Sequence, residues 1–104
     1  ELLMDTTTLI QEAKARFAHN SAKAYLKDKY DSKLIVADQG GLWKASPELI
    51  GYLASNTDEQ VILVDTFENP VLVNRVQLHD VLDKAYNDAM NLWYSEWKEL
   101  EAKR

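Results

Sequence analysis

Hydrophobic residues recur every three or four positions over two long stretches, one near each end of the chain. This spacing places apolar side chains on one face of a helix. In the first stretch, from Leu9 to Tyr30, polar residues at 19–21 interrupt the pattern. We therefore expect either one long N-terminal helix or two helices with a bend at Asn20.

The second stretch predicts a final helix of about 28 residues, about 42 Å long. Strands of six or seven residues span only about half of that length. Half of this helix must therefore overhang any sheet, and its Trp residues must pack against the N-terminal helix or against another subunit. Its later apolar residues alternate at heptad-like spacing; they are Tyr86, Met90, Trp93, Trp97 and Leu100.

Two hairpins are predicted between these helices. Residues 33–45 contain two β-favouring runs around Gly40–Gly41, which can take the positive φ angles of a tight turn. Residues 61–73 contain a second pair of runs around the turn 68–70. The aliphatic runs at 34–37 and 61–64 do not alternate with polar residues, which is typical of strands covered on both faces.

Capping residues mark the predicted helix boundaries. Ser46, followed by Pro and Glu, is a good N-cap, and it begins a short helix that Asn56 is expected to end in the left-handed conformation. Thr8 and Asn74 are also predicted N-caps, because each is followed three residues later by a Gln, which is the capping-box position. The sequence predicts a single α+β domain over residues 1–104. It would hold a small antiparallel sheet of two hairpins, flanked by long N- and C-terminal helices, and one short central helix.

Composition narrows the class of protein. The chain has 104 residues, no cysteine and a net charge of −5. These values predict one core, no disulfide framework and no thiolate metal site. No apolar run reaches the ~18–20 residues of a membrane span, so we expect a cytoplasmic protein without a membrane partner.

No group of residues predicts an active site, so we expect no enzyme activity, no cofactor and no metal. His79, Asp80 and Asp83 lie within one helical turn, but a metal site usually needs a further His or Cys. A hydrolase built on carboxylates is left as a third interpretation. The carboxylates in question fall at strand ends and turns; they are Asp38, Asp58, Glu59, Asp65 and Glu68.

One basic segment departs from the acidic balance of the chain. Residues 14–33 contain six Lys or Arg residues and two Asp residues. Arg16, Lys23 and Lys27 lie along one side of a continuous helix, with Tyr25 and Tyr30 near enough to stack on bases. The alternative interpretation is a solvated face, or a face that pairs with the acidic surface of a neighbouring subunit.

Parts of the chain resemble small conserved proteins of contractile-tailed phages, with relatives expected in cyanophages and marine metagenomes. The similar segments are 41–50 (GLWKASPELI) and 65–74, running on through Leu78 to 86–93. The resemblance covers roughly residues 40–97. The family has no assigned activity, so the resemblance implies no functional residues. One marine phage-type group adopts an Sm-like small barrel that forms rings and is thought to contact nucleic acid. A barrel with added helices is therefore the alternative fold.

These observations favour a non-enzymatic phage-type accessory or assembly protein, acting in the infected host cell through self-association and contacts with a phage or host protein. We predict a homo-oligomer whose interface includes Tyr86, Met90, Trp93, Trp97 and Leu100. The alternative function is an Sm-like or basic-helix nucleic-acid-binding module in phage RNA or DNA processing. Its binding residues would be Arg16, Lys23, Tyr25 and Lys27.

Overall fold

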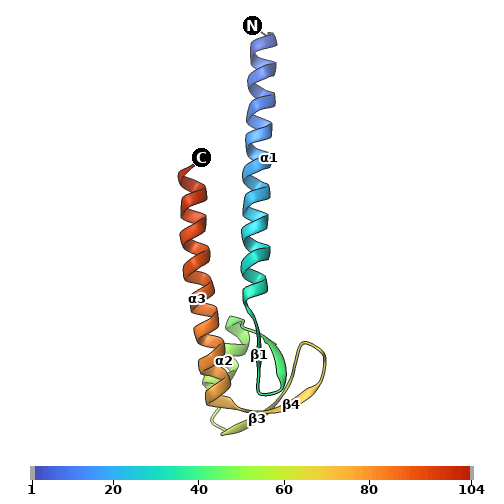
Figure 1. Cartoon of the computed structure of the whole chain (residues 1–104), viewed down its shortest axis with the longest axis vertical. Coiled ribbons are helices and arrows are strands. Elements are labelled where there is room, and N and C mark those ends of the chain that lie inside the picture. Colours follow the sequence, from blue (N-terminus) through green and yellow to red (C-terminus); the bar gives the residue numbers. More distant parts are fainter. Residues whose placement is uncertain (1, 104) are drawn as a thin grey trace.

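The computed structural model describes residues 2–103, with side chains from Thr6 onward, and shows two long helices above a small head (Figure 1). Helices α1 and α3 lie side by side and antiparallel. The predicted α+β class, with long terminal helices and a short central helix, is confirmed. The elements in chain order are α1 (Leu2–Lys33), β1 (Ile35–Asp38), β2 (Gly41–Lys44), α2 (Pro47–Ser55), β3 (Gln60–Val64), β4 (Pro70–Asn74) and α3 (Arg75–Ala102).

The four strands form two separate antiparallel pairs, β1–β2 and β3–β4. We expected the two hairpins to share one sheet. They are linked by hydrogen bonds at two places instead. The N–H of Thr66 donates to the carbonyl of Leu42 at 2.9 Å, and the side-chain oxygen of Gln39 accepts from the N–H of Asn74 at 2.7 Å. No closed barrel forms in the part of the chain that the structure describes, so the Sm-like alternative is wrong for this region.

Helix α1 differs from its predicted start. It begins at Leu2 and passes through Asn20 without a break, so Thr8 lies inside the helix and does not cap it. The backbone N–H groups near Thr8 already have helical carbonyl partners one turn earlier, so they need no cap. One long helix, the first of the two predicted alternatives, is therefore correct.

Two turn residues also differ from the prediction. The β1–β2 turn is made by Gln39 and Gly40, with φ angles of 50° and 82°, whereas Gly41 pairs with Asp38 in the ladder. A side chain at Gly41 would meet the Trp43 ring at 2.5 Å, so this position needs glycine for space and not for φ. Asn56 ends α2 with an extended backbone (φ −78°).

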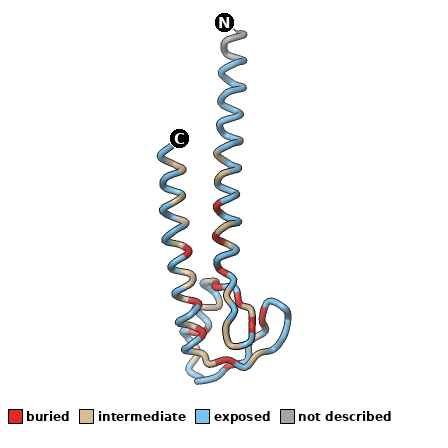
Figure 2. The backbone as a smooth tube through the Cα atoms, in the orientation of Figure 1, coloured by how far each residue is buried: buried red, intermediate tan, exposed pale blue. Residues whose placement is uncertain are grey.

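The core lies where the head meets the lower halves of α1 and α3. Figure 2 shows buried residues in the head and in the lower halves of the two helices, whereas residues 6–18 of α1 are all exposed. Burial of a large apolar side chain contributes about 1.5–3 kcal/mol, so this cluster holds the head to the helices. Its most deeply buried large side chains are Tyr30, Trp43, Leu53, Val73, Leu78 and Leu82.

The molecule is far from spherical. Its dimensions are 71 × 25 × 19 Å and its radius of gyration is 20.4 Å, whereas a compact domain of this length has a value near 13 Å. An elongated chain leaves much of its surface uncovered. None of the described helices combines the length and the apolar character that crossing a membrane requires.

Candidate interaction surfaces

The heptad-like stripe of α3 packs mainly against α1 and the core. The Trp93 ring stacks on Tyr30 of α1, with centroids 6.0 Å apart and planes 8° from parallel. Trp93 thus meets the N-terminal helix, one of the two predicted alternatives, while Trp97 keeps 39% of its surface exposed. The partly buried Tyr86, Met90 and Leu100 also pack on the core. A contact of this stripe with another subunit stays a prediction.

Polar pairs hold the two helices together beside these rings. The Lys29 ammonium donates to the Glu96 carboxylate at 2.8 Å. This hydrogen bond raises the pKa of Lys29 and lowers the pKa of Glu96, because it favours the charged form of each. Higher up, His19 Nε2 lies 3.2 Å from a Glu101 oxygen. Because α1 does not bend at Asn20, His19 lies on the side of the helix that faces α3.

Arg16, Lys23 and Lys27 share one side of α1, as predicted, but the two tyrosine rings expected to stack on bases do not lie beside them. Tyr25 is nine residues from Arg16, which is two and a half turns and therefore the opposite side. Tyr30 is 1% exposed, so the prediction that it stacks on bases is wrong. Lys27 pairs with Asp31 at 3.3 Å.

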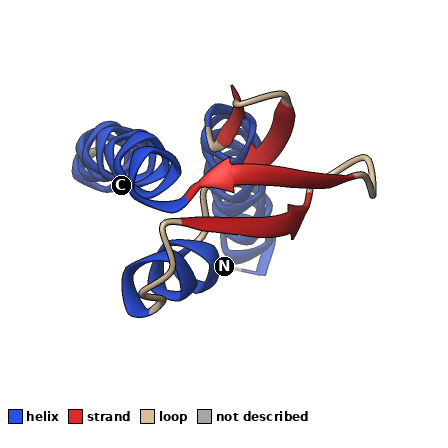
Figure 3. Ribbon diagram, turned by 90° about the horizontal axis from the view of Figure 1, so that it is seen from below, coloured by secondary structure: helices blue, strands red, loops and turns tan. Residues whose placement is uncertain are grey.

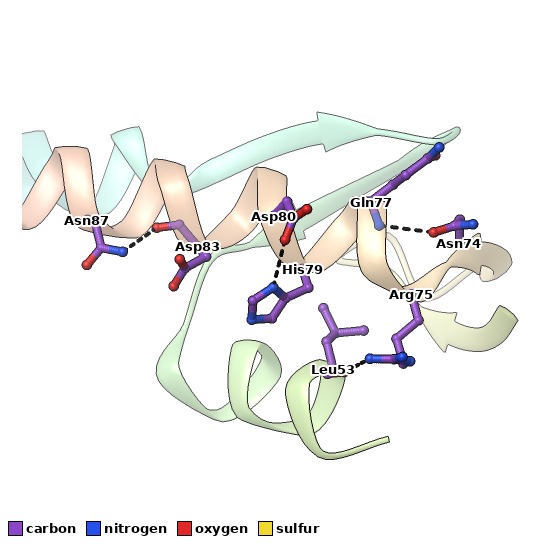
Figure 4. A network of polar contacts seen from close by, with 8 residues as sticks. All are labelled: Leu53, Asn74, Arg75, Gln77, His79, Asp80, Asp83 and Asn87. Carbon is purple, nitrogen blue, oxygen red and sulfur yellow. Dashed lines mark hydrogen bonds and ion pairs between the residues drawn. The ribbon is translucent and has the colours of Figure 1, made fainter. Parts of the chain in front are cut away.

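The candidate metal ligands at the start of α3 do not converge. Figure 4 shows His79 Nδ1 beside an Asp80 oxygen, 3.1 Å away, whereas the main-chain carbonyl of Asp83 accepts from Asn87. Among the residues with described side chains, no group of three or more His, Asp or Glu residues is arranged to hold a metal ion.

The remaining polar contacts in Figure 4 are structural. The Asn74 side chain accepts from the backbone N–H of Gln77 at 3.0 Å and caps α3, as predicted. The Arg75 guanidinium donates to the carbonyls of Leu53 (2.7 Å) and Asp58 (2.6 Å). Arg75 thereby fixes the end of α2 and the following loop to the start of α3.

Asp65, one of the carboxylates in the hydrolase interpretation, is buried and organises a turn. It accepts backbone N–H groups from Asn69 (3.0 Å), Phe67 (3.0 Å) and Leu42 (3.2 Å). These bonds, led by that of Asn69, hold the pKa of Asp65 below its usual range against the opposing effect of burial. The carboxylate closes the β3–β4 turn and ties it to β2. Three donors occupy its oxygens, which leaves little acceptor capacity for acid–base chemistry.

The upper half of α1 carries an uncovered apolar surface, here called the free stripe. It consists of Leu9, Ile10, Ala13 and Phe17, and its three large members are 51–75% exposed. Phe17 lies nine residues from Leu26, which faces α3, so the stripe is on the opposite side of α1 from α3. Extending α3 would therefore not cover it.

The head carries a second such surface, here called the head patch, made by Ile62, Val64, Phe67 and Leu72. These side chains are 59–69% exposed, and Ile62 is paired directly with Leu72 across the ladder. Figure 3 shows β3 and β4 in front when the molecule is viewed from below, so their outer face ends the molecule. The run 61–64 does not alternate with polar residues, which predicted a strand covered on both faces. The chain itself covers only one face of this hairpin and leaves the other face exposed.

No family model, curated protein or solved structure matches the chain. The candidate surfaces therefore rest on geometry alone. Sequence reasoning placed an interface on α3 and gave neither the free stripe nor the head patch that role. The signal for the head patch was present in the apolar run 61–64, whereas the free stripe has the same spacing as a buried helix face.

Proposed function

We propose that this chain is a non-enzymatic assembly protein that acts through self-association and protein–protein contacts, of the accessory type found in phages. The observation that carries the proposal is the free stripe. Ala15 lies beside Lys103, so residues 2–14 of α1 extend about 20 Å beyond the end of α3. An isolated helix of this length is marginally stable in water, so a partner that covers its apolar side would stabilise it.

The elongated shape supports the same function. The core occupies the head end, so the chain has two apolar surfaces that its own fold leaves open. Contiguous exposed apolar patches on a small protein are typical of interaction sites. The phage context comes from the sequence resemblance and motivates a structural role in a particle or a complex.

Nucleic-acid binding is the less supported function. Arg16 and Lys23 are available for phosphate contacts, but the rings proposed for base stacking are buried or on the other side of α1. The absence of these rings from the basic side matters because stacking of a base on an aromatic ring contributes about 1–3 kcal/mol per base in proteins that bind single strands. Phosphate contacts alone would have to overcome the net negative charge of the chain.

Light scattering coupled to size-exclusion chromatography tests the proposal. Scattering is needed because an elongated monomer elutes early. We expect a dimer or larger species at micromolar concentration, and a monomer of 11.9 kDa at all concentrations would overturn self-association.

A pair of variants locates the interface. Phe17→Asp should abolish association without changing the thermal stability of the monomer, because Phe17 is 75% exposed. Tyr25→Asp is the matched control: it makes the same charge change at a 65% exposed aromatic outside the free stripe and should leave association intact. Equal effects of the two variants would mean that the free stripe is not the interface.

A further inference from the structure

We infer that the molecules associate head to tail, with the free stripe of one copy docked on the head patch of the next. The inference rests on the proposed self-association and names the surface that each copy contributes. The free stripe and the head patch lie at opposite ends of a molecule 71 Å long. A single chain cannot bring them together, so a contact between the two surfaces requires two copies.

Charge distinguishes the two ends. Residues 34–80, which form the head, contain seven Asp or Glu residues and two Lys or Arg residues. Residues 6–24, around the free stripe, contain three Lys or Arg residues and one Glu. Glu59 and Glu68 are exposed at the two ends of the hairpin that carries the head patch. A basic, apolar helix therefore meets an acidic, apolar sheet.

Pairing of like surfaces is disfavoured by the same charges. Arg16 flanks the free stripe beside Phe17, so two stripes packed in parallel would bring these cations together. Two head patches would likewise bring Glu59 and Glu68 of one copy close to those of the other. Like charges opposed across an interface weaken association and suppress that mode of pairing.

The dimensions of the two surfaces agree. From Leu9 to Phe17 the stripe extends about 12 Å along the helix axis. Each strand of the hairpin has five residues and extends about 17 Å. A helix laid along this hairpin covers both strands, because neighbouring strands are only about 4.8 Å apart.

Head-to-tail contact uses two different surfaces and is therefore a heterologous interface. Each added copy offers a new free end, so the assembly either closes into a ring or grows as a filament. A symmetric dimer, in contrast, would consume both equivalent surfaces and stop at two copies.

Complementation between two variants tests this arrangement. Ile10→Asp/Phe17→Asp disables the free stripe and leaves the head patch intact. Ile62→Asp/Leu72→Asp disables the head patch and leaves the free stripe intact. We expect each variant alone to be monomeric. An equimolar mixture should form a dimer of twice the 11.9 kDa chain mass and nothing larger, because only one functional interface remains.

The outcomes separate the two levels of the proposal. A monomeric wild-type chain would overturn both self-association and head-to-tail docking. A wild-type assembly that persists in the head-patch variant would overturn only the docking, as would a mixture of two folded variants that stays monomeric. Because Asp lowers strand propensity, Ile62→Thr/Leu72→Thr repeats the test with β-favouring residues, and circular dichroism reports folding of every variant. Raising the salt concentration should weaken the wild-type assembly; an unchanged or tighter assembly would contradict charge pairing.

Discussion

Ser46 holds the start of α2 with one side-chain hydrogen bond. Its hydroxyl oxygen accepts from the backbone N–H of Leu49 at 3.2 Å, and its backbone is extended, as an N-cap requires. Ser46→Ala should therefore lower the free energy of unfolding by about 1 kcal/mol, measured by urea denaturation. Association should not change, because Ser46 belongs to neither the free stripe nor the head patch.

Ser95→Ala is the matched control for this substitution. Ser95 is exposed in the middle of α3, where Ala has the higher helix propensity, so this variant should be neutral or slightly more stable. If Ser46→Ala were equally neutral, the hydroxyl would not cap α2 in solution.

Asp65 makes the stability of the head depend on pH. Its pKa is lowered in the folded state, so the ionised carboxylate stabilises the fold above the ordinary carboxyl range. That contribution is lost as the pH falls through the folded-state pKa. Asp65→Asn should lower the melting temperature at neutral pH, because an amide NH₂ cannot accept from the Leu42 N–H. The difference in melting temperature between Asp65→Asn and the wild type should become smaller at acidic pH.

Glu68→Gln provides the comparison for Asp65→Asn. It makes the same change from carboxylate to amide in the same turn, at an exposed position. Its effect on melting should be small and nearly independent of pH. If the difference in melting temperature between Asp65→Asn and the wild type stayed constant down to strongly acidic pH, the charge of Asp65 would not be what stabilises the turn.

The contact between α1 and α3 depends on a few large rings. Trp93→Ala should lower the free energy of unfolding by about 2–3 kcal/mol, toward the low end for aromatic truncation because Trp93 is only partly buried. Tyr94, its neighbour in sequence, is 60% exposed, and Tyr94→Ala should cost under about 1 kcal/mol. Chemical denaturation of both variants measures the contrast. Equal losses would mean that the Trp93–Tyr30 stack does not form in solution.

The same helix tests the interface predicted from sequence. Trp97 is the most exposed of the stripe residues named for that interface. If α3 forms the oligomer contact, Trp97→Ala should weaken association and leave unfolding nearly unchanged. Retained association in this variant would assign self-association to surfaces other than α3.

Local patterns predicted most elements because their causes are local. The Ser46–Pro47 start of α2 and the Asn74 cap of α3 depend on side chains within three residues of the helix end. The start of α1 was missed at Thr8 because a capping box is sufficient only where no earlier helical turn satisfies the same N–H groups. The Gln39–Gly40 turn was missed by one residue because the Trp43 ring, not local φ preference, demands glycine at position 41.

The surfaces of the whole molecule were harder to predict. The free stripe has the 3–4 spacing of a buried helix face, and spacing alone does not say whether the chain itself provides the cover. That answer depends on where α3 ends relative to α1, which is a property of the three-dimensional pairing. The head patch was predicted in part. The apolar run 61–64 indicated that both faces of its strand are covered, but the sequence does not show what covers the face that the chain itself leaves exposed.

The antiparallel pairing of α1 and α3 also determines when the fold can close during synthesis. Lys29 and Glu96 are 67 residues apart in sequence yet bonded to each other. At ribosomal rates of about 5–20 residues per second, α1 emerges roughly 3–13 s before its partner. Throughout that interval an apolar, basic helix has no intramolecular cover. A nascent chain is therefore most vulnerable to aggregation, and most accessible to chaperones, before α3 has been made.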